Sequence, residues 1–298
     1  MQGASVNQAR RLIVSADDFG LSSGVNAGIM AAHREGILTD ASLMVNGAAF
    51  AEAVELARAT PTLSVGLHLV LVQGHATLPP QQLPGLVGAD GMFRNNPVLN
   101  GLRYFFTPGL RRQVEREVYA QIEKYLATGL PLSHVDGHLN IHMHPTVLGI
   151  LLRRAAAYGI RAMRLPREPL RISLRLDAGA LPRKVSEALT FKALAAYGRP
   201  RLDAQGIRYP DQMFGLHQSG HVTEAYLLGV LHSLPRGVTE IYSHASIVDA
   251  EARRWRPADY ECEAELAALT GGGVRAALAA GEIRCISYRE MAAAPPVT

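Results

Sequence analysis

Histidines and acids gather in one short stretch of the sequence, SHVDGHLNIHMHP at residues 133–145. The stretch holds four histidines, together with Asp136 and Asn140. Imidazole is the commonest protein ligand for metals and also transfers protons near neutral pH. This composition indicates metal binding or acid–base catalysis, and a hydrated polar loop is the structural alternative.

A pair of adjacent acids, Asp17 and Asp18, follows the apolar run RLIVSA. Two carboxylates at short range resist joint ionisation. A divalent metal relieves this conflict, because one carboxylate can bind the ion while the other stays free as a base. The structural alternative is that one acid caps the following helix and its neighbour faces solvent.

Four more polar side chains stand within or directly after apolar runs. Asn46 follows ASLMV, His68 lies in VGLHLVL, Arg164 lies in IRAMRLP and His244 follows EIYS. A histidine is a candidate metal ligand or general acid, and an arginine can orient a carboxylate through two hydrogen bonds. Taken singly, each has an ordinary structural explanation as a buried or surface polar residue.

The apolar runs alternate with segments of helical periodicity along the whole chain. Expected strands cover 11–20, 41–47, 63–71, 132–136, 160–166, 238–246 and 282–288. Expected helices cover 21–36, 48–61, 111–129, 145–159, 223–235, 259–271 and 273–281. This alternation predicts a parallel sheet with helices outside it, in a single α/β domain.

The number of strand–helix units favours a distorted or incomplete (β/α) barrel. Residues 74–110 and the basic segment 166–206 break the alternation and are expected to be insertions. The active site of such barrels lies at the carboxyl ends of the strands. Six separate segments are expected to deliver polar side chains to that edge, namely Asp17 with Asp18, Asn46, His68, Asp136 with His138, Arg164, and His244.

Composition and missing motifs narrow the function. The chain has no apolar run of about 18 residues, and its start, MQGASVNQAR, lacks the apolar core of a signal peptide. With only Cys262 and Cys285, we expect reduced thiols and a cytoplasmic location. No phosphate loop, dinucleotide fingerprint or GxSxG elbow is present. Metal-assisted hydrolysis remains, with one aspartate and two histidines holding a divalent ion.

Positive charge is concentrated in residues 161–208, which hold eleven Arg or Lys and four acids. A patch of this kind attracts anionic surfaces such as lipid headgroups. Nucleic acid is not expected as a partner, because no nucleic-acid-binding motif accompanies the patch. Contact with the inner membrane surface is therefore one interpretation, and a solvated arginine-rich lid over the barrel is the other.

Four ordered stretches, SADDFGLSSGVNAGI, VGLHLVL, SHVDGHLNIHMHP and EIYSHAS, resemble the YdjC-like carbohydrate deacetylases. The resemblance covers most of the chain. It implies a distorted barrel of the glycoside hydrolase/deacetylase type and removal of N-acetyl groups from amino sugars. The form GHLNIHMHP and the basic insertion are most similar to the branch associated with hopanoid biosynthesis, which implies an N-acetylglucosaminyl hopanoid, a glycolipid, as substrate.

The resemblance also implies roles for individual residues. Asp17 matches the catalytic base, and Asp18, His68 and His138 match the ligands of one divalent metal. His244 matches a histidine that protonates the leaving amine, although the chain has Ala after it where many members have Pro.

Other positions are assigned around these. Arg164 is expected to hold the base in place. The residues expected near the substrate or around the ligands are Asn46, Asp136, Asn140 and His142. His134 and His144 are expected to be structural. Asn140 replaces the middle histidine of the His-x-His-x-His pattern of many members.

The expected cofactor is zinc, although a mixed nitrogen and oxygen site also suits magnesium, manganese, nickel or cobalt. Three other functions stay open. They are deacetylation of soluble chito-oligosaccharides, a two-metal phosphoesterase, and a non-catalytic sugar- or lipid-binding barrel.

Overall fold

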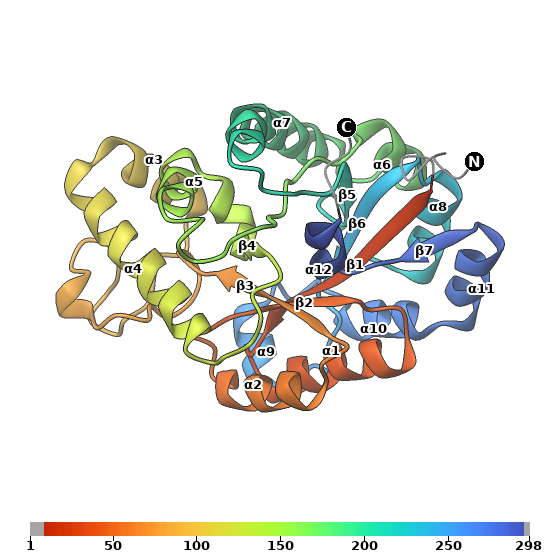
Figure 1. Ribbon diagram of the computed structural model, residues 1–298, viewed down its shortest axis with the longest axis horizontal. Helices are drawn as coiled ribbons and strands as arrows, with labels where there is room; N and C mark the ends of the chain where they lie inside the picture. The colour runs from red at the N-terminus through yellow and green to blue at the C-terminus, as the bar shows by residue number, and fades with distance from the viewer. Residues whose placement is uncertain (1–8, 295–298) are drawn as a thin grey trace.

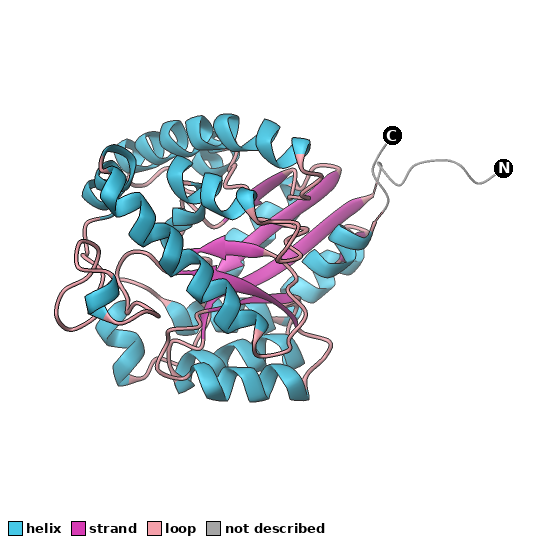
Figure 2. Ribbon diagram, turned by 60° about the vertical axis from the view of Figure 1, so that its left-hand side comes forward, coloured by secondary structure: helices cyan, strands magenta, loops and turns pink. Residues whose placement is uncertain are grey.

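The computed structural model describes residues 9–294. Seven parallel strands form a curled sheet at the centre, and helices surround it (Figures 1 and 2). The expected single α/β domain with an incomplete barrel is confirmed. Residues 1–8, which belong to the segment that indicated no signal peptide, lie outside the described residues.

The elements follow one another in chain order as the alternation predicts. The strands are β1 (Arg10–Phe19), β2 (Asp40–Leu43), β3 (Ser64–Leu69), β4 (Val135–Gly137), β5 (Gln212–Phe214), β6 (Gly237–Ser243) and β7 (Ile283–Cys285). The helices are α1 (Ser23–Glu35), α2 (Phe50–Ala59), α3 (Pro97–Phe106), α4 (Pro108–Leu126), α5 (Pro145–Arg153), α6 (Leu170–Leu176), α7 (Leu181–Ala204), α8 (Glu224–Ser233), α9 (Ala250–Trp255), α10 (Cys262–Thr270), α11 (Gly272–Ala280) and α12 (Tyr288–Ala293). Two 3₁₀ segments are η1 (Pro80–Gln82) and η2 (His138–Met143).

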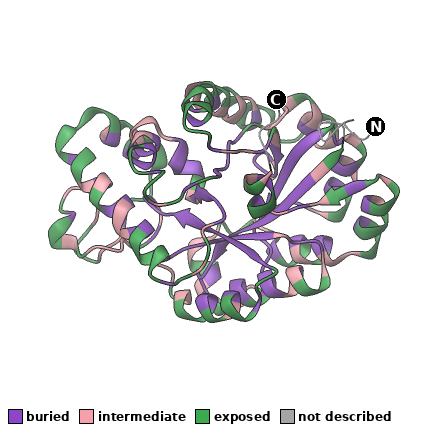
Figure 3. Ribbon diagram, viewed as in Figure 1, coloured by how far each residue is buried: buried purple, intermediate pink, exposed green. Residues whose placement is uncertain are grey.

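The strands pair in the order β4-β3-β2-β1-β6-β5, and β7 pairs with the first residues of β1. Strand β1 is the centre of this arrangement, because it is paired along Arg10–Ala16 with β6 and from Ser15 onward with β2. Its residues Leu12, Ile13 and Val14 have no exposed surface. A continuous apolar run of this kind is typical of a parallel strand covered on both faces. Figure 3 shows the buried sheet inside the more exposed helices.

The predicted strand at 160–166 is wrong. This segment is extended and lies between β4 and β5, but it makes only two single bridges, Val135 to Met163 and Ala162 to Arg208. Strand β4 is only three residues long, and Pro166 has no N–H to donate, so a continuous ladder does not form. The segment nevertheless closes part of the open side of the barrel.

Residues 74–110 and 166–206 contain helices that the composition did not reveal. Helix α3 starts at Pro97, after Asn96, whose side chain accepts a hydrogen bond from the N–H of Leu99 at 2.9 Å. Asparagine before a first-turn proline is a standard helix start. Helices α6 and α7 occupy the basic segment. No helix of the described residues is long and apolar enough to cross a membrane.

One buried acid couples this fold to pH. Asp40, at the start of β2, is fully buried and accepts a hydrogen bond from the backbone N–H of Tyr288 at 3.1 Å. Burial raises the pKa of this carboxyl from 3.8 to about 7, although its hydrogen bonds act in the opposite direction. The folded state therefore binds a proton that the unfolded state releases at lower pH.

Replacing Asp40 by Asn should remove one pH-dependent contribution to stability and so change the slope of stability against pH. Because the folded pKa of Asp40 lies above the unfolded one, this carboxyl makes a contribution to stability that is lost as pH rises from about 4 to about 7. Asp40→Asn removes this contribution, and chemical denaturation across that range measures it. Equal slopes in both proteins would contradict the expectation.

Candidate metal and catalytic site

The carboxyl ends of β1, β3, β4 and β6 surround one cavity. Asp17 and Asp18 end β1, His68 lies near the end of β3, His138 follows β4 and His244 follows β6, and all five line the cavity. The expected convergence of the strand ends is therefore present for these residues. The cavity is at the edge where the active sites of (β/α) barrels lie.

A bulge at the end of β1 explains how two adjacent acids reach the same cavity. In a regular strand, neighbouring side chains point to opposite faces. The pairing of β1 with β2 is irregular between Ala16 and Phe19, and Asp18 has a φ of 68°. This left-handed conformation is costly for a residue other than glycine, and bulges re-aim side chains next to active sites. The strand end thus places both carboxylates in the cavity.

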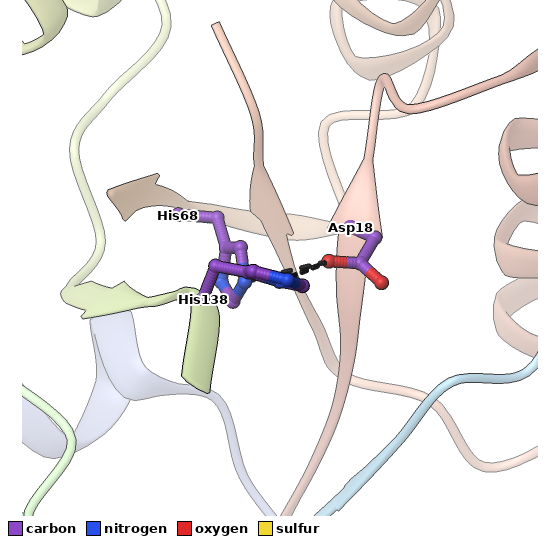
Figure 4. A group of neighbouring side chains, drawn as sticks. All are labelled: Asp18, His68 and His138. Carbon is purple, nitrogen blue, oxygen red and sulfur yellow. Dashed lines mark ion pairs between the residues drawn. The ribbon is translucent and has the colours of Figure 1, made fainter. Parts of the chain in front are cut away.

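Three donor atoms lie close together in this cavity (Figure 4). Oδ1 of Asp18 is 3.4 Å from Nε2 of His68 and 3.3 Å from Nδ1 of His138. Among the described residues, Asp18 Oδ1 and His68 Nε2 are buried without a hydrogen-bond partner. Buried polar atoms left in this way usually have a function. One carboxylate and two imidazoles are the donor set of catalytic zinc sites, so these residues fit a divalent ion.

The protonation of the site matches this donor set. Burial alone would raise the pKa of Asp18, but His138 and Arg256 hold it well below its usual value. Burial would lower the pKa of His68, yet the carboxylates of Asp136, Asp17 and Asp18 raise it to about 9. The same field that keeps a proton on His68 attracts a cation, and a metal would displace that proton.

The orientation of His68 is fixed from behind. Its Nδ1 is 2.8 Å from Oδ1 of Asp136, the residue opposite it on β4, and 3.0 Å from Oγ of Ser42. A carboxylate on the second ring nitrogen leaves Nε2 directed toward the cavity. This is the usual support of a histidine that binds a metal.

Arg164 joins three buried carboxylates. Its guanidinium donates to both carboxylate oxygens of Asp17, at 2.8 and 2.9 Å, and lies 2.9 Å from oxygens of Asp136 and Glu240. The side chain is buried, and these acids raise its pKa although burial opposes them. The guanidinium thus already occupies oxygens of both acids in the second group of possible donors, Asp17, His68 and Asp136. Of the donor groups that the described residues form, Asp18–His68–His138 is thus the open one.

His244 lines the opposite side of the cavity beside Tyr242 and Tyr260. Burial lowers its pKa to about 4, and the carboxylate of Asp18 only partly opposes this effect. Its ring is therefore neutral at pH 7, and Nδ1 is buried without a hydrogen-bond partner among the described residues.

The other sequence candidates are placed differently. Asn140 lines the cavity, whereas Asn46 lines a neighbouring hollow and donates a hydrogen bond to the carbonyl of His75. His142 is fully buried, and its Nε2 is 2.9 Å from the carbonyl oxygen of Arg164. Asp136 is equally buried. His142 and Asp136 are thus buried behind the cavity, where their side chains hold Arg164 and His68 in place, and they do not face a substrate.

His134 is also buried, as its expected structural role requires. Its ring stacks on Tyr288 with centroids 4.0 Å apart. It also covers Gly66, where an added Cβ would lie 2.4 Å from the ring. His144 is half-buried beside Tyr104 and Phe105.

Several residues of the site were missed in the sequence. Glu240 and Tyr242 in β6 and His244 directly after it stand two residues apart. Because alternate residues of a strand share a face, this spacing could have predicted that all three point to the same side of the sheet. Arg256 follows α9 and donates to Oδ2 of Asp18 at 3.3 Å and to the carbonyl of His244 at 2.6 Å. No local pattern in the sequence marks Arg256, since its partners are distant in the chain.

Comparison with known proteins identifies the family of this chain. Residues 11–280 match the family described as YdjC-like protein. The chain belongs to the YdjC-like family. A carbohydrate deacetylase of Geobacillus stearothermophilus is 32% identical over 94% of this chain and 98% of its own length. A chitooligosaccharide deacetylase of Salmonella schwarzengrund is 32% identical over 91% of this chain and 94% of its own.

Other comparisons cover less or show mainly the fold. A carbohydrate deacetylase of Brevibacillus brevis is 44% identical over half of this YdjC-like protein and 57% of its own length. A solved structure from Enterococcus faecalis V583, provisionally named for cellobiose-phosphate cleavage, superposes with a TM-score of 0.73. It is 26% identical over 95% of this chain and 98% of its own.

Removing one imidazole should remove metal binding. His138→Ala deletes a donor that is partly exposed, and we expect zinc affinity to fall by more than about a hundredfold. The control is His221→Ala, because His221 also lies near two acids, Asp259 and Glu261, but outside the donor set. Calorimetric titration with zinc measures both. Unchanged affinity in His138→Ala would remove it from the ligand set.

Arg164→Met should destabilise the protein strongly. The substitution leaves buried carboxylates without their partner, which costs about 3–5 kcal/mol. Arg153→Met is the control, since its ion pair with Glu115 at 2.7 Å is half-exposed and is worth less than about 1 kcal/mol. Denaturant titration measures both free energies of unfolding. Similar losses would show that the Arg164 network contributes little.

Proposed function

We propose that this YdjC-like protein is a metal-dependent hydrolase that removes an N-acetyl group from an amino sugar. The observation that carries the proposal is the open donor set Asp18–His68–His138 beside the carboxylate of Asp17 in one cavity. Relatives named carbohydrate deacetylase and chitooligosaccharide deacetylase support the reaction class.

Each residue of the site has a separate role in the proposed amide hydrolysis. A divalent ion held by Asp18, His68 and His138 would supply a Lewis acid for the acetyl carbonyl and lower the pKa of a water molecule. Asp17 takes the proton of the water that adds to the carbonyl carbon, as a general base. Arg164 keeps both oxygens of Asp17 in fixed positions, so the base does not rotate between turnovers.

The departing nitrogen needs a proton before the C–N bond breaks. His244 faces the same cavity and is neutral at rest, because burial lowers its pKa to about 4. In this proposal it takes up a proton from solvent as negative charge develops on the attacked oxygen, and then gives that proton to the amine, while Asp17 returns the proton of the attacking water to solvent. The products are acetate and a free amino sugar.

Zinc is the proposed ion, because two imidazoles and one carboxylate form its common catalytic donor set. A two-metal phosphoesterase is the less favoured alternative. The second group of possible donors, Asp17, His68 and Asp136, has the Arg164 guanidinium within 2.9 Å of both acids, and a cation would displace it. A non-catalytic binding barrel does not explain why Asp18 Oδ1 and His68 Nε2 are buried without hydrogen-bond partners among the described residues.

Two substrate classes remain in the proposal. Soluble chito-oligosaccharides fit the name of the Salmonella relative. An N-acetylglucosaminyl hopanoid fits the similarity of GHLNIHMHP and of the basic segment to the hopanoid-associated branch. In that case, exposed arginines of α6 and α7, such as Arg171, Arg175 and Arg199, would contact the membrane surface from the cytoplasmic side.

Asp17→Asn should abolish acetate release while the ion still binds. The amide cannot accept the proton of the attacking water, so we expect kcat to fall by about 10²–10⁴. Zinc-loaded wild-type and variant proteins would be incubated with diacetylchitobiose and with an N-acetylglucosaminyl lipid, and acetate would be measured. Calorimetry with zinc confirms that the variant retains its ion. Phosphate release from sugar phosphates, with no acetate from either substrate, would overturn the proposal.

A further inference from the structure

A separate hollow, the α7 hollow, lies between helix α7 and residues 165–170. Its volume is about 610 Å³, within the range of about 300–1,000 Å³ that is usual for small-molecule sites. None of the described residues lines both this hollow and the catalytic cavity, whereas Phe191 and Leu216 also line a wide groove beside α3. A molecule in the α7 hollow is therefore separate from a substrate at Asp18.

One face of α7 forms a wall of the hollow. Apolar and basic side chains recur on this face with the period of a helix, namely Ala188, Leu189, Lys192, Ala195, Ala196 and Arg199. A different face of α7, at positions 183, 187, 190 and 194, lines the groove beside α3. The helix thus presents one set of side chains to the groove and another to the α7 hollow.

Small side chains on α7 leave the space, and the opposite wall is fixed. Leu165 and Leu170 line that wall, and Leu165 is buried directly after Arg164. The backbone N–H of Met213 donates to the carbonyl oxygen of Arg167 at 3.1 Å, which holds this segment beside β5. On the side of α7, Leu189 is 64% exposed. The hollow is therefore preformed and offers apolar surface that an alkyl chain can bury.

Basic side chains dominate the charge of the hollow. Arg167 belongs to the segment opposite α7, and Lys192 and Arg199 belong to the helix itself. Among the described residues, neither Arg167 nor Lys192 forms an ion pair, and Arg199 has only Asp203, at 3.9 Å. Lys192 and Arg199 are two helical turns apart, about 10 Å along the axis. All three are exposed, so the positive charge lies where the hollow meets solvent.

The acid that lines the hollow, Glu168, does not offset this charge. Its carboxylate accepts hydrogen bonds from the N–H of His217 at 3.1 Å, the hydroxyl of Tyr226 at 3.1 Å and the hydroxyl of Ser173 at 2.5 Å. Ser173 and Tyr226 belong to α6 and α8, so the carboxylate is engaged with those helices. Apolar walls with three cations against one engaged acid attract an anion that carries an apolar group.

We infer that the α7 hollow is a second ligand site, which binds a single-chain amphiphile with an anionic head group, a long-chain carboxylate or an alkyl phosphate. The alkyl chain lies against Leu189 and the alanines of α7. The head group lies at Arg167, Lys192 and Arg199, whose N–H groups form charge-assisted hydrogen bonds with either oxyanion. The site is independent of the proposed hydrolysis. It also differs from a contact with a membrane surface, because one molecule enters the hollow.

Calorimetry with matched ligands tests this chemistry. Decanoate, methyl decanoate, decyl phosphate and hexanoate are titrated into the full-length protein at concentrations that form no micelles. We expect decanoate to bind at least about tenfold more tightly than its methyl ester, which lacks the charge. Hexanoate should bind at least about tenfold more weakly than decanoate, because it buries fewer methylene groups. The tighter of decanoate and decyl phosphate identifies the head group.

Two pairs of variants on α7 test the position of the site. Ala196→Phe fills the hollow and should weaken decanoate binding at least about tenfold. Ala193→Phe is its control, since Ala193 is also exposed on α7 but does not line the hollow. Lys192→Gln should weaken decanoate binding about three- to tenfold and leave methyl decanoate unaffected. Arg201→Gln, at an exposed residue of α7 outside the hollow, should change neither.

Four results would overturn the inference. The first two are equal affinities for decanoate and its methyl ester, and equal losses in Ala196→Phe and Ala193→Phe. The third is a tenfold loss of decanoate binding in His138→Ala, which would place the carboxylate in the catalytic cavity. The fourth is binding of phosphatidylglycerol vesicles without binding of decanoate or decyl phosphate, which would make the basic segment a membrane-contacting surface instead of a ligand site.

Discussion

The buried guanidinium of Arg164 is the interaction on which the site depends. It is bonded to Asp17 from β1, Asp136 from β4 and Glu240 from β6, so it ties together three strands that are distant in the chain. Four carboxylates, those three and Asp18, pair with two guanidinium groups of the described residues, Arg164 and Arg256, so these six groups carry a formal charge of −2 when the histidines are neutral. A divalent ion would balance that charge, and the proton on His68 balances part of it. Stability and the proposed metal binding therefore rest on the same electrostatic arrangement.

Backbone conformations that are unfavourable elsewhere occur where the cavity needs them. Asp18, Leu139 and Asn140 all have positive φ values, and all three line the cavity. At Asp18 the strand bulges, and both acids of the pair become available. At Leu139 the turn after His138 directs an apolar side chain outward. The surrounding sheet is mostly buried and is paired in parallel, and it provides the stability that such strain requires.

The site joins two environments with different roles. The donor atoms lie in a small polar cavity with buried walls, where charges act strongly on one another. A wide groove of about 1410 Å³ lies beside it, lined by apolar side chains of α3 and, from α7 and residues 216–261, by both apolar and charged side chains. The groove belongs largely to residues 97–106 and 177–194, which lie in the segments that interrupt the strand–helix alternation.

The sequence by itself determined the fold class and which polar residues meet in the cavity. Apolar runs predicted β1, β3 and β6, because buried parallel strands are hydrophobic on both faces. Polar residues at the ends of these strands and of β4 predicted that Asp17, Asp18, His68, His138 and His244 lie together, as they do in the cavity. Tertiary structure alone decided the rest. The segment 160–166 became an extended bridge because β4 is short, and His142 turned into the core toward the carbonyl of Arg164. The role of Arg256 depends on its contacts with Asp18 and His244, and the exposed face of α3 lines a groove that distant segments complete. Local periodicity in the sequence carries no information about such long-range contacts.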